Sequence, residues 1–534
     1  MAVVIAVSLF TNLEISANLS LRDSIVSDFD TLIAIVEDTH PDPYTNYGGR
    51  VSFHERANEI RKILRNTEKP SIAQLHELST GFLAGLQDGH SFMERLDVKN
   101  SDSGMDSLVL VKFEYVDSHL VVNAIDKDAS HLLGSRLTGI SSEPIEKVLE
   151  RVAAINPCEN EAGRYNYMTG YFRSLDTYRK LSGKVSGDVS LELVTPLGEN
   201  VSYKPKVIYS GDFNSTDKAR TPRNGDYPTS HMEWRETDGN MVLRLSSILA
   251  RENFEYQYNN GWDFYSQLQY YYWNQRIEMP GDTLAAINAI PEFSETFIDM
   301  LSEMKSKKID NLIIDLRGNG GGWTPVIIPS LYMMFGDDYL TTDMESKFYR
   351  RLSDLYLKKI NTSLERFNAE HNTAYNTGDY IMPDENETSC PIEQKRAEFI
   401  RQAFCSERVK DRLKALDGRP LYRPKNIYVV TDGGTFSAAF HYAFYLSKMG
   451  AVIAGETSSQ APNCYMEVTP FVLPLTGLTG SVSNSLQAFL PSVDPRARQF
   501  TPDVRISYED YCRLGFDQNA ILMHIIESCN DNGK

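Results

Sequence analysis

Cysteine and long apolar runs are scarce in this sequence. Six cysteines in 534 residues are too few for a disulfide framework, and no two of them have the C-x-x-C spacing of a zinc or redox site. We therefore expect unpaired or incidentally paired thiols. No stretch approaches the roughly 18 apolar residues that a membrane-spanning helix needs, so the sequence predicts no membrane span.

Positive charge is also in short supply. The chain has 54 Lys and Arg against 72 Asp and Glu, which gives a formal net charge of −18. Nucleic acids and anionic membrane surfaces bind basic faces, so we expect neither as a main partner. The apolar content of 41% is ordinary for a globular protein.

The N-terminus, MAVVIAVSLFTNLEIS, contains a short apolar run without the basic residues that usually precede a signal-peptide core. This pattern favours a leader remnant over residues 1–18, and a first strand is the alternative.

The length implies two or three domains. Apolar residues recur at helical spacing in 71-SIAQLHELSTGFLAGLQDGH-90, with Ser71 as the expected N-cap, so we predict a helical region over 19–98. Alternating β-branched residues predict a small β-rich module over 99–215. From 216 to 534 strands alternate with helices, which indicates an α/β core with a mainly parallel sheet. A charged, partly helical insert interrupts this core at about 340–422.

Two loops of the core follow buried strands. In 312-LIIDLRGNGGGW-323 the glycines have neither the G-K-[ST] ending of a phosphate-binding loop nor the G-x-G-x-x-G dinucleotide spacing. Their N–H groups suit an oxyanion hole, and a tight structural turn is the alternative. In 431-TDGGTFSAAFHYAF-444 Ser437 lies where a strand turns into a helix, so it is either a helix cap or a nucleophile.

A serine nucleophile needs a base within hydrogen-bond reach. His90 is the first candidate because it follows the end of a helix near Asp88-Gly89. His441 is the rival, one helical turn after Ser437. The aromatic run 261-GWDFYSQLQYYYWNQ-275 either lines a substrate cleft or lid, or packs beneath an insertion.

Taken together, these loops resemble the serine peptidases of the C-terminal processing (tail-specific) protease and tricorn-core family. The similarity is greatest to the branch with an N-terminal L-x-D-G-H motif, here Leu86 to His90. NLIIDLRGNGGG matches the family's strand and glycine motif, and Thr435 to Ala438 match its T-x-S-A motif. HPDPY, FVLPLTGLTGSVSNS and 501-TPDVRI-506 also fit, whereas the insert does not.

The resemblance implies a crotonase-like α/β catalytic core and a PDZ-like identity for the β-rich module. It implies that Ser437 is the nucleophile, that His90 is the general base and that the N–H groups of Gly321 and Ala438 form the oxyanion hole. Neither a metal nor a cofactor is needed. The expected activity is that of a serine endopeptidase acting on extended peptides or unfolded protein segments through an acyl-enzyme.

The sequence departs from the family in two places, and one role stays open. Tail-specific members use a Ser-Lys dyad, but GETSSQAPN has no lysine where the family places it, which favours a Ser-His mechanism. Phe440 stands where the family has an acidic residue after the S-A-x sequence. Asp494 and Glu456 are the candidates for a supporting carboxylate.

Two other functions stay open: a weak or inactive peptide-binding protein on the same scaffold, and an esterase-type serine hydrolase. The leader and the usual export of relatives predict an extracytoplasmic location, periplasmic or secreted, with a cytoplasmic one as the alternative. The oligomeric state is left open.

Overall fold

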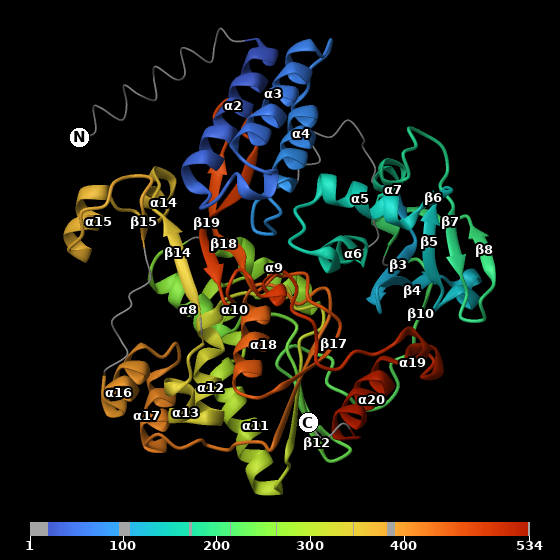
Figure 1. The fold of residues 1–534 in the computed structure, drawn as a ribbon. Helices are drawn as coiled ribbons and strands as arrows, with labels where there is room; N and C mark the ends of the chain where they lie inside the picture. The colour runs from blue at the N-terminus through green and yellow to red at the C-terminus, as the bar shows by residue number, and fades with distance from the viewer. Residues whose placement is uncertain are drawn as a thin grey trace.

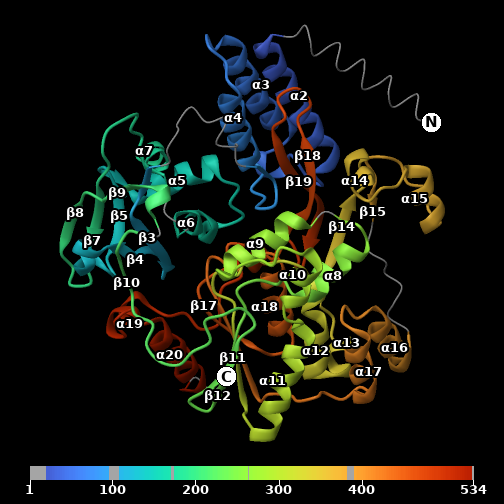
Figure 2. The same cartoon turned by 180° about the vertical axis from the view of Figure 1, so that it is seen from behind.

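The computed structural model has three regions, arranged as Figure 1 and Figure 2 show: helices at the N-terminus, a β-rich module and an α/β core. It describes residues 20–94, 107–169, 174–213, 215–262, 264–344, 346–381 and 390–531. The leader expected at 1–18 lies outside these residues. Among the described residues no helix combines the length and the apolar character needed to cross a membrane. The described cysteines, Cys158, Cys390, Cys405, Cys464 and Cys512, are free.

The N-terminal region consists of helices α2 (Leu21–Thr39), α3 (Arg50–Asn66) and α4 (Ile72–Ala84). The Ser71 side chain accepts a hydrogen bond from the Gln74 N–H, which confirms the predicted cap of α4. Apolar faces of the helices meet in one buried cluster, to which Phe471 and Val482 of the core contribute. The helical region is therefore packed onto the core, at the top of Figure 1.

The β-rich module contains a seven-stranded sheet with the order β10-β4-β5-β7-β8, in which β3 pairs with β4 and β6 with β5. Its strands are β3 (Val111–Val116), β4 (His119–Asp126), β5 (Arg136–Ile140), β6 (Glu143–Pro144), β7 (Leu191–Val194), β8 (Asn200–Tyr203) and β10 (Lys218–Arg220). Its helices are α5 (Ile145–Ile155), α6 (Glu161–Thr169) and α7 (Leu175–Leu181), and β2 (Ser107–Val109) pairs with β9 (Val207–Tyr209). The module has its own buried core.

The core is built on a five-stranded sheet, β11-β12-β13-β16-β17, in which all pairs except β11 with β12 are parallel. The strands are β11 (Trp234–Thr237), β12 (Asn240–Arg244), β13 (Asn311–Asp315), β16 (Asn426–Thr431) and β17 (Val452–Gly455). The predicted α/β core with a mainly parallel sheet is therefore confirmed.

Helices cover both faces of this sheet. Alternate residues of β13 point to opposite sides, as the period of a strand requires. Leu312 and Ile314 pack with α11 (Phe293–Lys307), α12 (Ile328–Phe335) and α18 (Ala438–Lys448), whereas Ile313 packs with α19 (Tyr508–Arg513) and α20 (Gln518–Asp531). Because both faces are buried, the central strands β13 and β16 are largely apolar, which is typical of parallel sheets.

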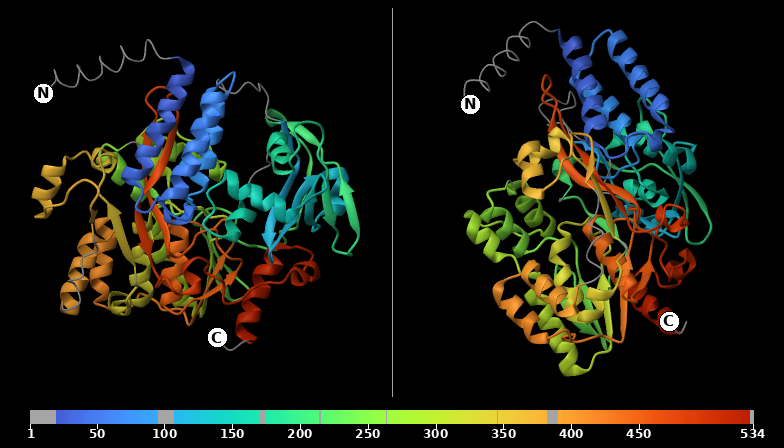
Figure 3. Two further views of the ribbon diagram at one scale, coloured as in Figure 1. Left: turned by 45° about the horizontal axis from the view of Figure 1, so that its top comes forward. Right: turned by 60° about the vertical axis from the view of Figure 1, so that its left-hand side comes forward.

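A second sheet joins distant parts of the chain. Its long hairpin consists of β18 (Cys464–Val472) and β19 (Thr479–Ala488). Strand β19 also pairs with β1 (Phe92–Met93), which begins two residues after His90. The insert adds strand β14 (Lys347–Arg351) to β19 and pairs it with β15 (Tyr380–Ile381), as Figure 3 shows in gold beside orange-red.

The described residues of this part of the chain also form helices: α13 (Asp337–Thr341), α14 (Asp354–Lys359), α15 (Leu364–His371), α16 (Ile392–Gln402) and α17 (Glu407–Leu416).

Candidate active site

Ser437 lies between β16 and α18, at the point that the sequence indicates. Its backbone has φ 53° and ψ −127°, a conformation with positive φ that is uncommon for a residue with a side chain. Its side chain does not cap the helix. Among the described residues, the hydrogen-bond contact of the Ser437 Oγ is His90 Nε2, at 3.3 Å. Of the two interpretations of this serine, the geometry therefore favours the nucleophile.

The loop that carries Ser437 is tied to the glycine loop after β13. The Phe436 N–H donates to the Asn319 carbonyl at 2.9 Å, and the Thr435 hydroxyl donates to the Leu316 carbonyl at 3.1 Å. The Asp432 carboxylate accepts from the Gly318 N–H at 2.8 Å. Because the two loops follow adjacent parallel strands, they meet at the carboxyl edge of the sheet, where open α/β sheets bind ligands.

Asp88 fixes the backbone and the surroundings of His90. This buried carboxylate accepts hydrogen bonds from the His90 N–H at 2.9 Å and from the Ser91 hydroxyl, and His40 Nε2 lies 3.3 Å away. Burial alone would raise the pKa of Asp88, but the hydrogen bond and charge of His40 hold it below its ordinary value. An ionised Asp88 therefore anchors the turn that presents His90.

Gly89, between Asp88 and His90, has no room for a side chain. A Cβ there would lie 2.6 Å from the Phe436 ring and 3.0 Å from the Glu159 carboxylate. The His90 ring stacks on the same Phe436 ring, with 4.8 Å between the ring centroids. The glycine therefore lets the helical region approach the serine loop closely.

His90 is suited to accept a proton near neutral pH. Burial lowers its pKa below the ordinary value of histidine, and the Asp88 charge opposes this only in part. The imidazole is then neutral near pH 7. Because Nε2 faces the hydroxyl of Ser437, the proton of the neutral ring belongs on Nδ1.

Glu159 is the site residue that the sequence analysis missed. It lies in the loop between α5 and α6, and its Oε1 is 3.8 Å from His90 Nδ1. Its carboxylate accepts hydrogen bonds from the Ala461 N–H at 2.8 Å and the Gly89 N–H at 3.3 Å. Burial raises the pKa of Glu159 to about 8. No local pattern marks this residue, because only the packing of the module against the core brings it to His90.

The two predicted oxyanion donors lie beside Ser437. A Cβ on Gly321, which has φ +103°, would be 2.6 Å from Ser437 Cβ and 2.9 Å from the Ala438 nitrogen. The Gly321 N–H already donates to the Asn319 side chain at 2.9 Å. Ala438 is the first residue of α18, and within the described chain nothing accepts its N–H. Ala438 is therefore the donor available to an oxyanion.

Neither predicted supporting carboxylate is placed against His90. Asp494 caps a short turn and forms an ion pair with Arg496 at 2.7 Å. Glu456 accepts a hydrogen bond from the Asp117 N–H at 3.0 Å, at the contact between the core and the module. Both carboxylates are held by these partners, and the carboxylate that lies near His90 Nδ1 is that of Glu159.

The rival base His441 is turned away from Ser437. It is buried in α18, and its Nδ1 lies 2.8 Å from the Thr324 hydroxyl. Burial lowers its pKa to about 3. His441 therefore packs inside the core, and the rival assignment has no geometric support.

A metal ion is a further possibility to weigh. Asp88, His90 and Glu159 offer ligand atoms within 4.8 Å of one another, the one such group found among the described residues. However, the Asp88 oxygens already accept from the His90 N–H and the Ser91 hydroxyl, and the Glu159 oxygens accept from two backbone N–H groups. Hydrogen bonds within the protein account for this cluster.

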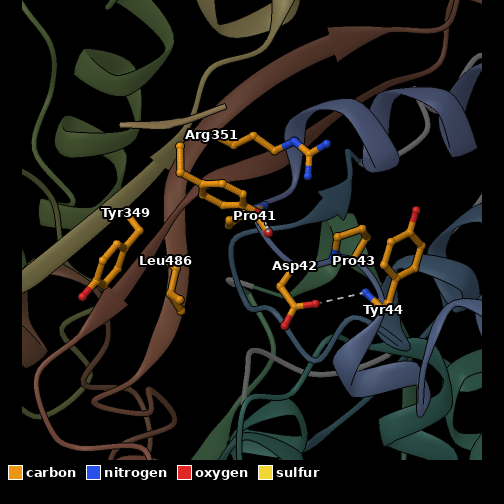
Figure 4. Close-up of a pocket in the computed structure, with 8 residues that line it drawn as sticks. Pro41, Asp42, Pro43, Tyr44, Tyr349, Arg351 and Leu486 are labelled. Atoms are coloured by element: carbon orange, nitrogen blue, oxygen red, sulfur yellow. Dashed lines mark hydrogen bonds between the residues drawn. The ribbon is translucent and has the colours of Figure 1, made fainter. Parts of the chain in front are cut away.

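An open pocket of about 460 Å³ lies next to His40, the residue near Asp88 (Figure 4). Its lining residues are Pro41, Asp42, Pro43, Tyr44, Tyr349, Arg351, Tyr380 and Leu486. The Asp42 carboxylate accepts from the Tyr465 hydroxyl at 3.2 Å, and the Tyr465 ring packs on His40. The pocket is thus connected to the site through side chains, although neither Ser437 nor His90 lines it.

Comparisons with known proteins bear on the fold and on part of the core. A search of curated proteins gives no match. The protein in the crystal structure of mature CPAF has 15% sequence identity to this chain. The two structures match with a TM-score of 0.55, over 95% of this chain and 98% of that chain. The complex of mature CPAF with lactacystin is 14% identical, with a TM-score of 0.53 over 95% and 99%.

The photosystem II D1 C-terminal processing protease is 13% identical and covers 94% of this chain and 99% of that chain, but its TM-score is only 0.37. The CPAF structures therefore establish a shared fold and nothing more. The family model for peptidase family S41 matches residues 284–479, which include both Gly321 and Ser437. Over these residues the chain is therefore similar to peptidase family S41.

Proposed function

We propose that this chain is a serine endopeptidase that cleaves extended peptides or unfolded protein segments through an acyl-enzyme. The observation that carries the proposal is the 3.3 Å contact between His90 Nε2 and the Ser437 Oγ, beside the Ala438 N–H. The family S41 match over 284–479 supports the same class of chemistry. The proposal includes a crotonase-like identity for the core and a PDZ-like one for the module.

The first half of the reaction forms the acyl-enzyme. His90 Nε2 takes the hydroxyl proton of Ser437, and Oγ attacks the peptide carbonyl carbon. The carbonyl oxygen becomes an oxyanion at the Ala438 N–H, where the positive end of the α18 dipole stabilises it. His90 then gives its proton to the leaving amine as the C–N bond breaks. In the second half, His90 takes a proton from a water molecule, whose oxygen attacks the acyl carbon. His90 then returns the proton to Ser437 Oγ as the acyl bond breaks and the peptide acid is released.

Glu159 orients and stabilises His90 in this mechanism. When the ring takes the serine proton it becomes a cation, and the carboxylate 3.8 Å from Nδ1 favours that state. Since burial raises the pKa of Glu159 to about 8, the carboxylate forms only as the pH approaches this value. Glu159 therefore makes the reaction faster in mildly alkaline solution.

Glu159→Gln is expected to change the pH profile of the activity. In the native chain, kcat/KM should rise in two steps, first as His90 becomes neutral below pH 6.5 and again near pH 8 as Glu159 ionises. The variant should lose the second step, and its kcat/KM at pH 9 should be about 10- to 100-fold lower, less than for a triad carboxylate in direct hydrogen bond.

Glu456→Gln is the matched control, because Glu456 is also buried with its pKa raised to about 8 but does not contact His90. It should keep both steps. An unchanged profile in Glu159→Gln would remove Glu159 from the mechanism.

Labelling with a fluorophosphonate tests the proposed function directly. The probe should attach to Ser437, identified by mass spectrometry, and the native chain should cleave denatured casein. Binding of casein without labelling would instead identify a peptide-binding protein. Labelling with turnover of simple esters but not of casein would identify an esterase.

A further inference from the structure

The described part of the aromatic run over 261–275 contains helix α9 (Tyr265–Gln275), and only some of its side chains are buried. Leu268, Tyr271 and Tyr272 are buried against α8 (Arg251–Asn259) and α10 (Thr283–Ala289) in a small cluster of their own. Other aromatic side chains of the run, including Trp262 and Trp273, are more than half exposed. The packing interpretation therefore explains only one face.

Four rings from separate parts of the chain form one surface group, which we name the aromatic patch: Tyr256, Trp262, Trp323 and Phe404. The Trp323 ring lies 5.8 Å from Tyr256, 5.9 Å from Trp262 and 5.8 Å from Phe404, measured between ring centroids. Tyr256 and Trp262 are 41% and 53% exposed. Phe404 belongs to the insert, between α16 and α17, so the insert helps to build the patch.

The aromatic patch is joined rigidly to the loop beside Ser437. The Ile248 N–H donates to the Gly321 carbonyl at 2.7 Å, and the Trp323 N–H donates to the Ile248 carbonyl at 2.8 Å. Gly321 itself lies against Ser437. Only Gly322 therefore separates Trp323 from Gly321 of the glycine loop, and a parallel bridge between Ile248 and Gly322 fixes this stretch.

The exposed rings of the patch, Tyr256 and Trp262, are not part of the buried cluster that packs α8, α9 and α10 together. The buried cluster around Leu268, Tyr271 and Tyr272 supplies the core of α8, α9 and α10, which lie together in Figure 2. Clustered aromatic rings on a surface mark binding sites more often than isolated ones do. None of the four side chains carries a charge, so the surface suits an apolar ligand.

We propose that the aromatic patch binds an apolar, aromatic-containing stretch of the polypeptide whose peptide bond reaches Ser437. This inference rests on the proposed function, because that function brings an extended chain past the patch. An extended peptide advances about 3.3 Å per residue, so side chains a few positions from the cleaved bond reach Trp323 and its neighbours. Unfolded segments expose such side chains, whereas folded proteins bury them.

The test measures binding without chemistry. Ser437→Ala serves as the parent, and the probe is fluorescein-labelled denatured casein followed by fluorescence polarisation. Adding Trp262→Ser should raise the Kd about fivefold or more, which is the range for an aromatic anchor of an interface. Trp262→Phe should restore most of the affinity. Trp273→Ser is the matched control, because Trp273 is 64% exposed but lies outside the patch, and it should change the Kd less than twofold.

Three results would overturn the inference. The first is equal affinity for the parent and the Trp262→Ser variant. The second is an equal loss with Trp273→Ser. The third is a shift from dimer to monomer in sedimentation with Trp262→Ser, which would make the patch a contact between two copies of the chain. If the native chain binds casein through the patch yet neither labels nor cleaves, the proposed function fails and the binding surface stands.

Discussion

Ser437→Ala is expected to abolish fluorophosphonate labelling and to lower kcat/KM on denatured casein by about 10⁴-fold or more, the scale seen when a serine nucleophile is removed. Oγ is the atom that forms the acyl bond, and within the described chain its hydrogen-bond contact is the neutral His90 ring at 3.3 Å. His90→Ala should have nearly the same effect, because without the base the hydroxyl proton has no acceptor.

The two residues should act as a unit, so the double variant should be little worse than either single one. His131→Ala is the control, since His131 is an exposed histidine of the module. Circular dichroism and thermal melts of each variant separate lost chemistry from lost folding. Full labelling of a folded Ser437→Ala protein would show that the nucleophile lies elsewhere.

Gly321→Ala is expected to lower kcat/KM by about 10²-fold or more, the cost of disturbing an oxyanion site. The added Cβ would lie 2.6 Å from Ser437 Cβ and 2.8 Å from the Phe436 carbonyl, and the φ of +103° disfavours any side chain. The glycine loop must move away from Ser437, which also shifts the Ala438 N–H relative to the oxyanion. The same strain should cost roughly 1–3 kcal/mol of the free energy of unfolding.

Gly320→Ala is the control one residue away. A Cβ there meets no atom within 4 Å, and its φ needs no glycine. Its kcat/KM should stay within about twofold of the native value, a limit set by surface substitutions of small effect. Comparable activity for the two variants would mean that the close approach of Gly321 to Ser437 has no part in the reaction.

The sequence predicted those parts of the fold that depend on local patterns. Ser71 was expected to cap α4 because a polar side chain precedes an apolar helical repeat, and it does. Apolar strands alternating with helices predicted the parallel sheet. The contact between His90 and Ser437 could be anticipated only through the family motifs, because nothing local relates residues 347 positions apart.

Other features depend on how distant regions pack. Glu159 reaches His90 only because the loop between α5 and α6 lies against the core, where the Ala461 N–H binds its carboxylate. The capture of the Gly321 N–H by Asn319 depends on the exact turn of the glycine loop. Asp494 looked favourable from its position in the chain, but a neighbouring arginine pairs with it.

The late position of β19 in the chain has a consequence for the nascent protein. This strand pairs with β1 beside His90, while its partner hairpin strand and the insert complete the same sheet. His90 is therefore synthesised well before the strand that pairs beside it, which follows some 390 positions later. At about 5–20 residues per second, a nascent chain contains His90 but not yet β19 for roughly 20–80 seconds. A polypeptide interrupted before β19 lacks the strand that pairs with β1, so the proposed peptidase activity should arise only after residues 479–488 have been made.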